Sequence, residues 1–94
     1  MDQQAVSTTH IRNDRVTVTE WSIPPGATTG LHRHERDYVV VPLTSGTLEL
    51  QTPDGDVQQG ELTAGVPYFR TAGVEHDVAN PGPATVVFTE IEIE

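Results

Sequence analysis

Short runs in which apolar and polar residues alternate at every second position cover most of this chain and limit what it can fold into. Side chains of a β-strand point alternately to opposite faces, so such a run buries one face and exposes the other. The first strong run, residues 15–23, is rich in β-branched residues and stops at Pro24-Pro25-Gly26. Further short runs lie between glycine and proline turns, at residues 31–34, 38–43, 47–51, 57–62, 68–71, 75–79 and 84–94. This spacing predicts an all-β barrel or sandwich.

The last run, residues 84–94, alternates most regularly. One set of positions holds Val87, Thr89, Ile91 and Ile93, and the other holds Glu90, Glu92 and Glu94. We expect the first set to be buried and the glutamates to form an exposed charged row, which would protect a sheet edge from pairing with other chains.

The chain length of 94 residues allows a single domain. We expect residues 1–14 to form an N-terminal segment or edge strand, and residues 15–94 to form the barrel. A domain of this size buries only roughly 60–65% of the surface of its unfolded chain, and without Cys no disulfide adds to its stability. Because the core is small, and because a terminal strand could extend a neighbour's sheet, we expect a homodimer.

Charge and hydropathy exclude two classes of partner. The formal net charge of -9 would repel a phosphate backbone, so we expect no binding to nucleic acid. No apolar run approaches the roughly 18–20 residues of a membrane span, so we expect no membrane partner. The first residues lack the basic and apolar segments of a secretory signal, which predicts a cytoplasmic location. A small-molecule ligand is the expected partner.

Two of the four histidines, His32 and His34, are separated by one residue in a short extended run. Alternate side chains of a strand share a face, so both imidazoles project to one side, with Cβ atoms about 6.5–7 Å apart. That span allows both rings to bind one metal ion. The same pair could also line a surface or form hydrogen bonds in a core, and the spacing alone does not separate these readings.

The residues around these histidines resemble the two motifs of the cupin family. The first motif, G(X)5HXH(X)3,4E(X)6G, is matched by Gly26, His32, His34 and Gly46, and only its Glu is missing. The second, G(X)5PXG(X)2H(X)3N, is matched by Gly65, Gly73, His76 and Asn80, with Thr71 in place of the Pro. The resemblance covers roughly residues 20–90, and the chain is similar to short cupins of which some are associated with β-alanine degradation.

This resemblance implies a fold and a ligand set. The fold is the cupin double-stranded β-helix, a jelly-roll barrel, with a divalent metal ion between the two motifs. His76 would be the third ligand after His32 and His34. Three neutral imidazoles with open positions suit Fe(II), Ni(II), Zn(II) or Mn(II), and the order of affinities does not choose among them.

The missing motif Glu falls at Tyr38 or Val39, depending on the spacing used. Tyr38 shares strand parity with the two histidines, so its phenol is a candidate ligand, catalytic group or pocket residue, although a buried structural Tyr is the commoner role. Glu35 and Asp37 have the opposite parity and are expected to face solvent, unless a bulge turns one of them toward the metal as a ligand. Water would then complete the coordination of the ion.

Several other side chains are assigned by position. Arg70 is a candidate anchor for a substrate carboxylate, with a surface ion pair as the alternative. His10 lies outside both motifs and is expected at the surface, not at the metal. Gly73 and Asn80 are expected to support turns. The remaining aromatic residues are expected in the core or at the pocket mouth: Trp21, Tyr68, Phe69 and Phe88.

Two functions follow from this reading. The first is a metal-dependent enzyme, a dioxygenase or an isomerase, acting on a small carboxylate or dicarbonyl molecule. The second is a non-catalytic cupin that binds or senses a small molecule in the same pocket. A third role, in which the metal only stabilises the barrel, would require a closed four-coordinate site.

Overall fold

The computed structural model describes residues 4–94, and every regular element in that range is a β-strand. The strands are β1 (Val6–Arg12), β2 (Val16–Ile23), β3 (His32–Arg33), β4 (Tyr38–Pro42), β5 (Gly46–Gln51), β6 (Val57–Leu62), β7 (Tyr68–Arg70), β8 (Glu75–Ala79) and β9 (Val86–Ile93). The predicted all-β fold is confirmed, and the predicted runs match β2 to β9 to within two residues at each end. No helix in this part of the chain is long and apolar enough to cross a bilayer.

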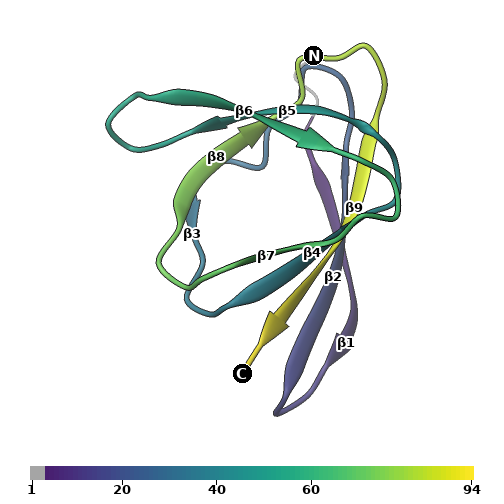
Figure 1. Ribbon diagram of the computed structural model, residues 1–94, viewed down its shortest axis with the longest axis vertical. Helices are drawn as coiled ribbons and strands as arrows, with labels where there is room; N and C mark the ends of the chain where they lie inside the picture. The colour runs from purple at the N-terminus through teal and green to yellow at the C-terminus, as the bar shows by residue number, and fades with distance from the viewer. Residues whose placement is uncertain (1–3) are drawn as a thin grey trace.

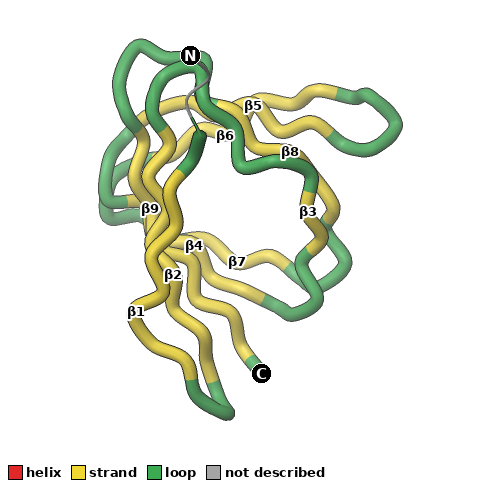
Figure 2. The backbone as a smooth tube through the Cα atoms, turned by 180° about the vertical axis from the view of Figure 1, so that it is seen from behind, coloured by secondary structure: helices red, strands yellow, loops and turns green. Residues whose placement is uncertain are grey.

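Two antiparallel sheets form the walls of the barrel. The larger has the order β1-β2-β9-β4-β7, and the smaller has the order β3-β8-β5-β6. Figure 1 shows the larger sheet on one side and the smaller on the other, with the β5–β6 hairpin extending beyond the barrel. Neighbouring strands are mostly distant in sequence, as β9 lies between β2 and β4 and β8 lies between β3 and β5. This topology is the double-stranded β-helix. Figure 2 shows the same arrangement from behind.

Residues 6–12 contribute a strand to the edge of the larger sheet, and residues 1–3 of the expected N-terminal segment lie outside the described residues. β1 pairs antiparallel with β2, with a register shift between Thr9 and Ile11. β2 in turn pairs with β9 along its whole length, from Val16 opposite Ile93 to Ile23 opposite Val86.

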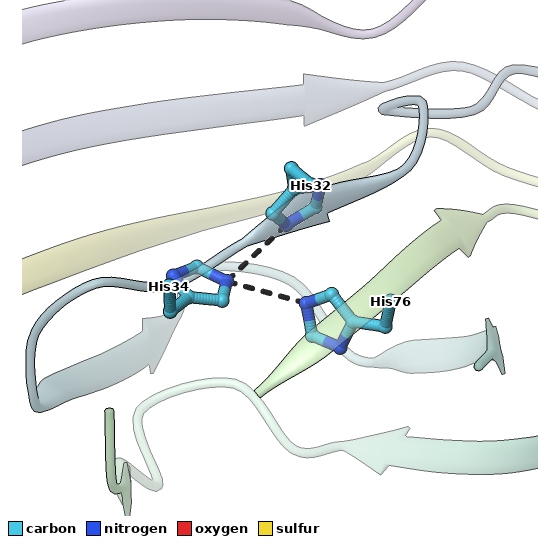
Figure 3. A group of neighbouring side chains, drawn as sticks. All are labelled: His32, His34 and His76. Carbon is cyan, nitrogen blue, oxygen red and sulfur yellow. Dashed lines mark hydrogen bonds between the residues drawn. The ribbon is translucent and has the colours of Figure 1, made fainter. Parts of the chain in front are cut away.

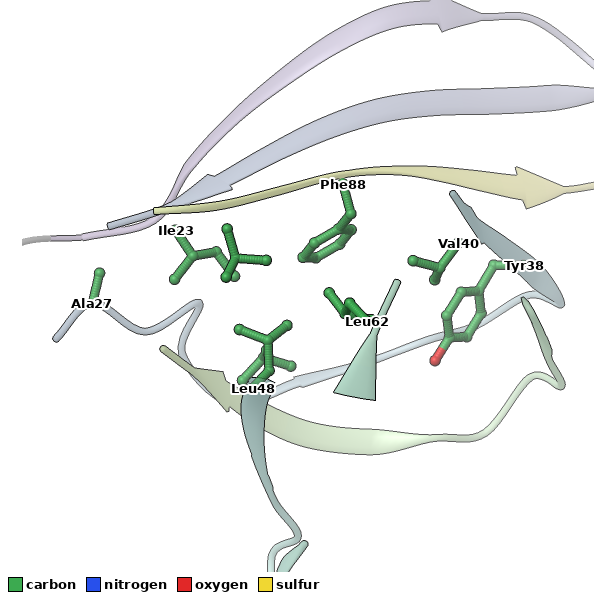
Figure 4. Close-up of a cluster of buried hydrophobic side chains, with 9 residues drawn as sticks. Ile23, Ala27, Tyr38, Val40, Leu48, Leu62 and Phe88 are labelled. Atoms are coloured by element: carbon green, nitrogen blue, oxygen red, sulfur yellow. The ribbon is translucent and has the colours of Figure 1, made fainter. Parts of the chain in front are cut away.

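The hydrophobic core fills space between the sheets, from Ala27 to Tyr38 (Figure 4). Burial of each large apolar side chain there stabilises the fold by roughly 1.5–3 kcal/mol. Partly buried side chains pack against this core, among them Trp21, Leu50 and Tyr68. The core itself consists of Ile23, Ala27, Tyr38, Val40, Leu48, Leu62, Val78, Val86 and Phe88.

The prediction is wrong for one of the aromatic residues that were expected in the core or at the pocket mouth. Phe69 is 51% exposed, whereas Tyr68 and Trp21 pack against the core and Phe88 belongs to it. The reason is strand parity, because Phe69 on β7 pairs with Val39 and points to the outer face of the sheet. Its neighbour Tyr68 points inward.

The expectation for the last strand is also wrong. On β9 the inward positions are Val86, Phe88 and Glu90, all of them buried, and the intervening Val87 and Ile91 face outward. β9 is an interior strand between β2 and β4, so it has no edge to protect. The outer face of an interior strand still packs against its neighbours, and β-branched residues suit both faces. Alternation alone therefore did not identify the inner face.

Asn80, which matches the last position of the second motif, ties the end of β8 to two other segments. Its side chain is 1% exposed. Its amide donates hydrogen bonds to the carbonyls of Ile23 (2.7 Å) and Ala84 (2.8 Å), and its Oδ1 accepts one from the Gly82 N–H (2.8 Å). The side chain therefore replaces backbone pairing in a turn, as its position predicts.

Candidate metal centre

The two motif histidine segments are paired directly in the smaller sheet. His32 on β3 lies opposite His76 on β8 in antiparallel register. The ladder continues past the end of β3, because the His34 N–H donates to the Val74 carbonyl and the Gly73 N–H donates to the His34 carbonyl, both at 2.8 Å. Gly73 has a φ of +100°, which favours glycine in this turn. These backbone bonds hold three histidines from two distant segments at one place.

The three imidazoles converge through their Nε2 atoms, as Figure 3 shows. The Nε2 atom of His34 lies 3.2 Å from that of His32 and 3.2 Å from that of His76. Two nitrogens bound to one ion at roughly 2.0–2.1 Å lie about 2.9–3.4 Å apart for bond angles between a right angle and the tetrahedral angle. The observed spacing therefore fits a single ion held by His32, His34 and His76.

The tautomers of these rings provide a second test of the fit. The Nδ1 atom of His32 is 2.8 Å from the Gly30 carbonyl oxygen, which can only accept, so Nδ1 carries the proton and Nε2 carries a lone pair. The Nδ1 atom of His34 faces a carboxyl oxygen of Glu90 at 3.7 Å, which favours the same tautomer. Two Nε2 lone pairs then face each other at 3.2 Å, and a cation between them relieves the repulsion.

The protonation equilibria agree with a metal-binding role. Burial, followed by the charges of the neighbouring His32 and His76, lowers the pKa of His34 to about 4. Burial, and then the charge of His32, lowers the pKa of His76 to about 4, against the opposing effect of Asp77. Both rings are therefore neutral at neutral pH, which is the form that binds metals.

Tyr38 lies against one member of the triad. Its ring stacks on the imidazole of His34, with centroids 4.0 Å apart and planes inclined by 20°. The side chain is 3% exposed, and burial followed by the charge of Glu90 raises the pKa of the phenol to about 12. The hydroxyl therefore remains protonated at neutral pH, and Tyr38 packs against the site as a neutral group.

Glu90 is the residue of the site that reasoning from the sequence missed. Its carboxyl group is 8% exposed, and burial, followed by the neighbouring Glu92, raises its pKa to about 7. Carboxylate oxygens of Glu90 and Glu92 lie within 4.8 Å of a ring nitrogen of His34. A signal was present, because Glu90 has the same strand parity as Phe88, which was expected from the sequence to lie in the core or at the pocket mouth.

A cavity of about 560 Å³ borders the histidines. Two triad members, His32 and His76, line it, together with Tyr38, Glu90 and Arg70. The rest of the wall is largely apolar and includes Trp21, Val40, Leu48, Leu50, Leu62, Val66, Val78 and Phe88. Its volume lies within the range of small-molecule sites.

Arg70 stands at this cavity and not in a surface ion pair. Its guanidinium carbon lies 4.6 Å from the centre of the Tyr68 ring, and its Nη1 donates to the Phe69 carbonyl at 2.9 Å. Within residues 4–94 no carboxylate lies within 4.0 Å of it. Most of its donors are therefore available to a ligand.

The other acidic and histidine candidates lie away from the triad. His10 is an exposed residue of β1, with Nε2 at 3.3 Å from a carboxyl oxygen of Glu20. Glu35 and Asp37 are both exposed, and the Asp37 carboxylate accepts a hydrogen bond from the Ala72 N–H at 2.8 Å.

Comparisons with known proteins agree with this architecture. The chain is 58% identical over 91 residues to the β-alanine degradation protein BauB of Pseudomonas aeruginosa, covering 97% of this chain and 95% of that one. A cupin domain from Bordetella pertussis superposes with a TM-score of 0.94 at 53% identity, covering 100% of this chain and 97% of the other. The polyketide cyclase RemF from Streptomyces resistomycificus shares the fold, with a TM-score of 0.74 at 22% identity over 95% of this chain and 64% of its own. Residues 19–92 match the family described as the cupin domain, and the chain belongs to that family.

Proposed function

We propose that this protein is a metal-dependent enzyme that acts on a small carboxylate or dicarbonyl molecule. The observation that carries the proposal is the convergence of three Nε2 atoms at the wall of a cavity of about 560 Å³. The Nε2 atom of His34 lies 3.2 Å from that of His32 and 3.2 Å from that of His76. Three protein ligands leave positions on an ion open to a substrate, whereas a purely structural site is closed by four.

The proposed ligands are His32, His34 and His76, and the ion is divalent: Fe(II), Ni(II), Zn(II) or Mn(II). When bound, it would polarise a carbonyl, acidify a neighbouring C–H group or a water molecule, or, as iron, support dioxygen chemistry. The three ligands are neutral, so they leave the full charge of the ion to attract an anionic or chelating substrate.

The cavity wall supports a substrate with two distinct ends. The Arg70 guanidinium offers donors to a carboxylate, and the apolar wall excludes water from the rest of the molecule. The 58% identity to a β-alanine degradation protein supports a substrate of this class, because β-alanine and any product that keeps its acid group carry a carboxylate. We therefore propose that this chain acts in β-alanine degradation.

Tyr38 would act in this reaction as a neutral group. Its phenol keeps its proton at neutral pH, so it is able to donate a hydrogen bond to a substrate oxygen but not to remove a proton. Its ring also holds the plane of His34 by stacking.

The test combines metal analysis with a substrate screen. Elemental analysis of the purified protein should give about one metal ion per chain, and samples loaded with each of the four metals should then be assayed with β-alanine, short 3-oxo acids and 1,2-dicarbonyl compounds. Oxygen consumption or product formation with one metal supports the enzyme. Arg70→Gln should raise KM for carboxylates about tenfold or more, whereas Arg12→Gln, which removes a charge on β1, should not.

The alternative is a non-catalytic cupin that binds the same molecules. The Tyr38 phenol keeps its proton at neutral pH, so it supplies no general base for turnover, which supports this alternative. In that case the metal-loaded protein would bind carboxylates in calorimetry, with a loss on Arg70→Gln, but would convert none of them with any of the four metals.

We also propose that the chain forms a homodimer through the outer face of the larger sheet. An uninterrupted apolar row crosses all five strands of that face, as the registers of the strand pairs establish. Burial of such a row against a second copy would supplement a small core. The row consists of Ile11, Val18, Ile91, Val39 and Phe69.

A further inference from the structure

One buried carboxyl group, that of Glu90, lies beside the metal site. Glu90 is 8% exposed and points inward from β9 between the core residue Phe88 and the metal site. Burying a carboxyl group is costly unless polar partners compensate for it, and a large apolar residue at this inward position would extend the core without that cost. The partners of Glu90 therefore indicate what it does.

Glu90 lies next to a histidine of the triad, His34. A carboxyl oxygen of Glu90 lies 3.7 Å from Nδ1 of His34, and both side chains are about 90% or more buried. The opposite nitrogen of the same ring, Nε2, is the atom that lies 3.2 Å from His32 and from His76. Glu90 thus approaches the side of the ring that faces away from the convergence point.

This position excludes Glu90 from the set of direct ligands. The ligand atoms of the three histidines lie within 4.8 Å of one another, and in the described chain no carboxylate joins all three in such a group. Glu90 and Glu92 group with His34 alone. Glu90 therefore does not replace the Glu that the first cupin motif lacks here.

One face of the His34 ring makes a further contact. Tyr38 stacks on one face at 4.0 Å, which fixes the plane of the ring but not its tautomer. A tautomer is fixed only by a partner at a ring nitrogen, and Nδ1 of His32 has such a partner in the Gly30 carbonyl. For His34 the corresponding partner is Glu90.

We infer that Glu90 is a positioning residue for the metal centre, whose carboxylate accepts the Nδ1–H of His34 and so presents the Nε2 lone pair to the ion. An N–H···O bond is about 2.7–3.2 Å long, so the carboxylate closes by about 0.5–1 Å or acts through one water molecule when the ion binds. A carboxylate in this place also raises the basicity of the imidazole ligand. The inference concerns metal binding and stands whether or not the protein is an enzyme.

The test measures metal affinity and stability separately. Zinc affinity should be determined by competition with a chromophoric chelator for the wild type, Glu90→Leu and Glu90→Gln. We expect Glu90→Leu to weaken binding about 10–100-fold and Glu90→Gln, which keeps an acceptor oxygen, to weaken it less. Glu20→Gln is the matched control, because it removes the same charge from the outer face of the adjacent strand and should change affinity less than about twofold.

Two further measurements separate positioning from a structural role. The melting temperature of chelator-treated Glu90→Leu should equal or exceed that of the wild type, since a buried acid is replaced by an apolar group. Nitrogen NMR of the zinc-loaded wild type should show a protonated Nδ1 on His34, and the Nδ1–H of the leucine variant should exchange faster with solvent. Unchanged zinc affinity in Glu90→Leu, or loss of affinity only in proportion to a lower melting temperature, would overturn the inference.

Discussion

The phenol ring of Tyr38 lies almost parallel to the imidazole of His34, with the two ring centroids 4.0 Å apart. Because this contact is made by the ring and not by the hydroxyl, Tyr38→Phe should keep zinc affinity within about threefold, whereas Tyr38→Ala should weaken it and lower the free energy of unfolding by about 3–5 kcal/mol. Chelator competition and urea unfolding measure the two quantities. A loss of affinity of tenfold or more in Tyr38→Phe would instead make the hydroxyl a ligand.

The three converging histidines should act as a unit. Each of His32→Ala, His34→Ala and His76→Ala removes one of three nitrogens and should lower zinc affinity by a factor of about 100 or more, whereas His10→Ala, on β1, should not change it. Metal should raise the melting temperature of the wild type by mass action and have little effect on the triple variant. Equal metal content in wild type and His76→Ala at matched pH would remove the third ligand.

Acid should destabilise the chelator-treated protein. The pKa values of His34 and His76 are lowered from 6.5 to about 4, so the unfolded chain binds protons more tightly and stability is lost as pH falls from about 6.5 to 4. The raised pKa of Glu90, about 7 instead of 4.5, acts in the opposite direction: its contribution is lost as pH rises from 4.5 to 7. The two histidines outweigh the one glutamate, so the free energy of unfolding should show a net fall on the order of 2–4 kcal/mol as the pH is lowered through this range.

Urea unfolding at a series of pH values measures this balance. Glu90→Gln removes the opposing contribution, so the free energy of unfolding should rise more steeply between pH 4.5 and 7 in that variant than in the wild type. A shallower rise in Glu90→Gln would contradict the assignment of signs.

Asn80 should be important for stability and not for metal binding. Asn80→Ala deletes three hydrogen bonds and leaves the carbonyls of Ile23 and Ala84 without their side-chain donor, which should cost about 2–4 kcal/mol. Denaturant unfolding gives this value, and zinc titration of the still-folded fraction should give wild-type affinity. The site would be coupled to this turn if affinity fell as well.

The proposed dimer has a direct test in a single charge substitution. Val39 lies in the apolar row on the larger sheet, between Ile91 and Phe69, so Val39→Glu should convert a dimer into a monomer in light scattering at micromolar concentration. Gln51→Glu adds the same charge to the exposed end of β5 on the other sheet and should leave the dimer intact. A wild type that is monomeric under these conditions would exclude the proposal.

The local sequence pattern was sufficient to predict much of the structure of this protein. Strand positions followed from alternation and from glycine and proline turns, since both depend only on residues close in sequence. The projection of His32 and His34 to one side followed from strand parity, and the resemblance to the two cupin motifs implied the third histidine. The fold and the place of His76 in the candidate site are therefore predictable from the sequence.

The tertiary structure decided what depends on which strands become neighbours. The alternation in β9 is compatible with burial of either face of the strand. Only its place between β2 and β4 directs Phe88 and Glu90 inward and Val87 outward. The same packing brings Glu90 to Nδ1 of His34 across 56 positions of sequence, a contact that no local periodicity encodes. Parity predicts that side chains alternate, but burial against the opposite sheet determines which face of a strand is the inside.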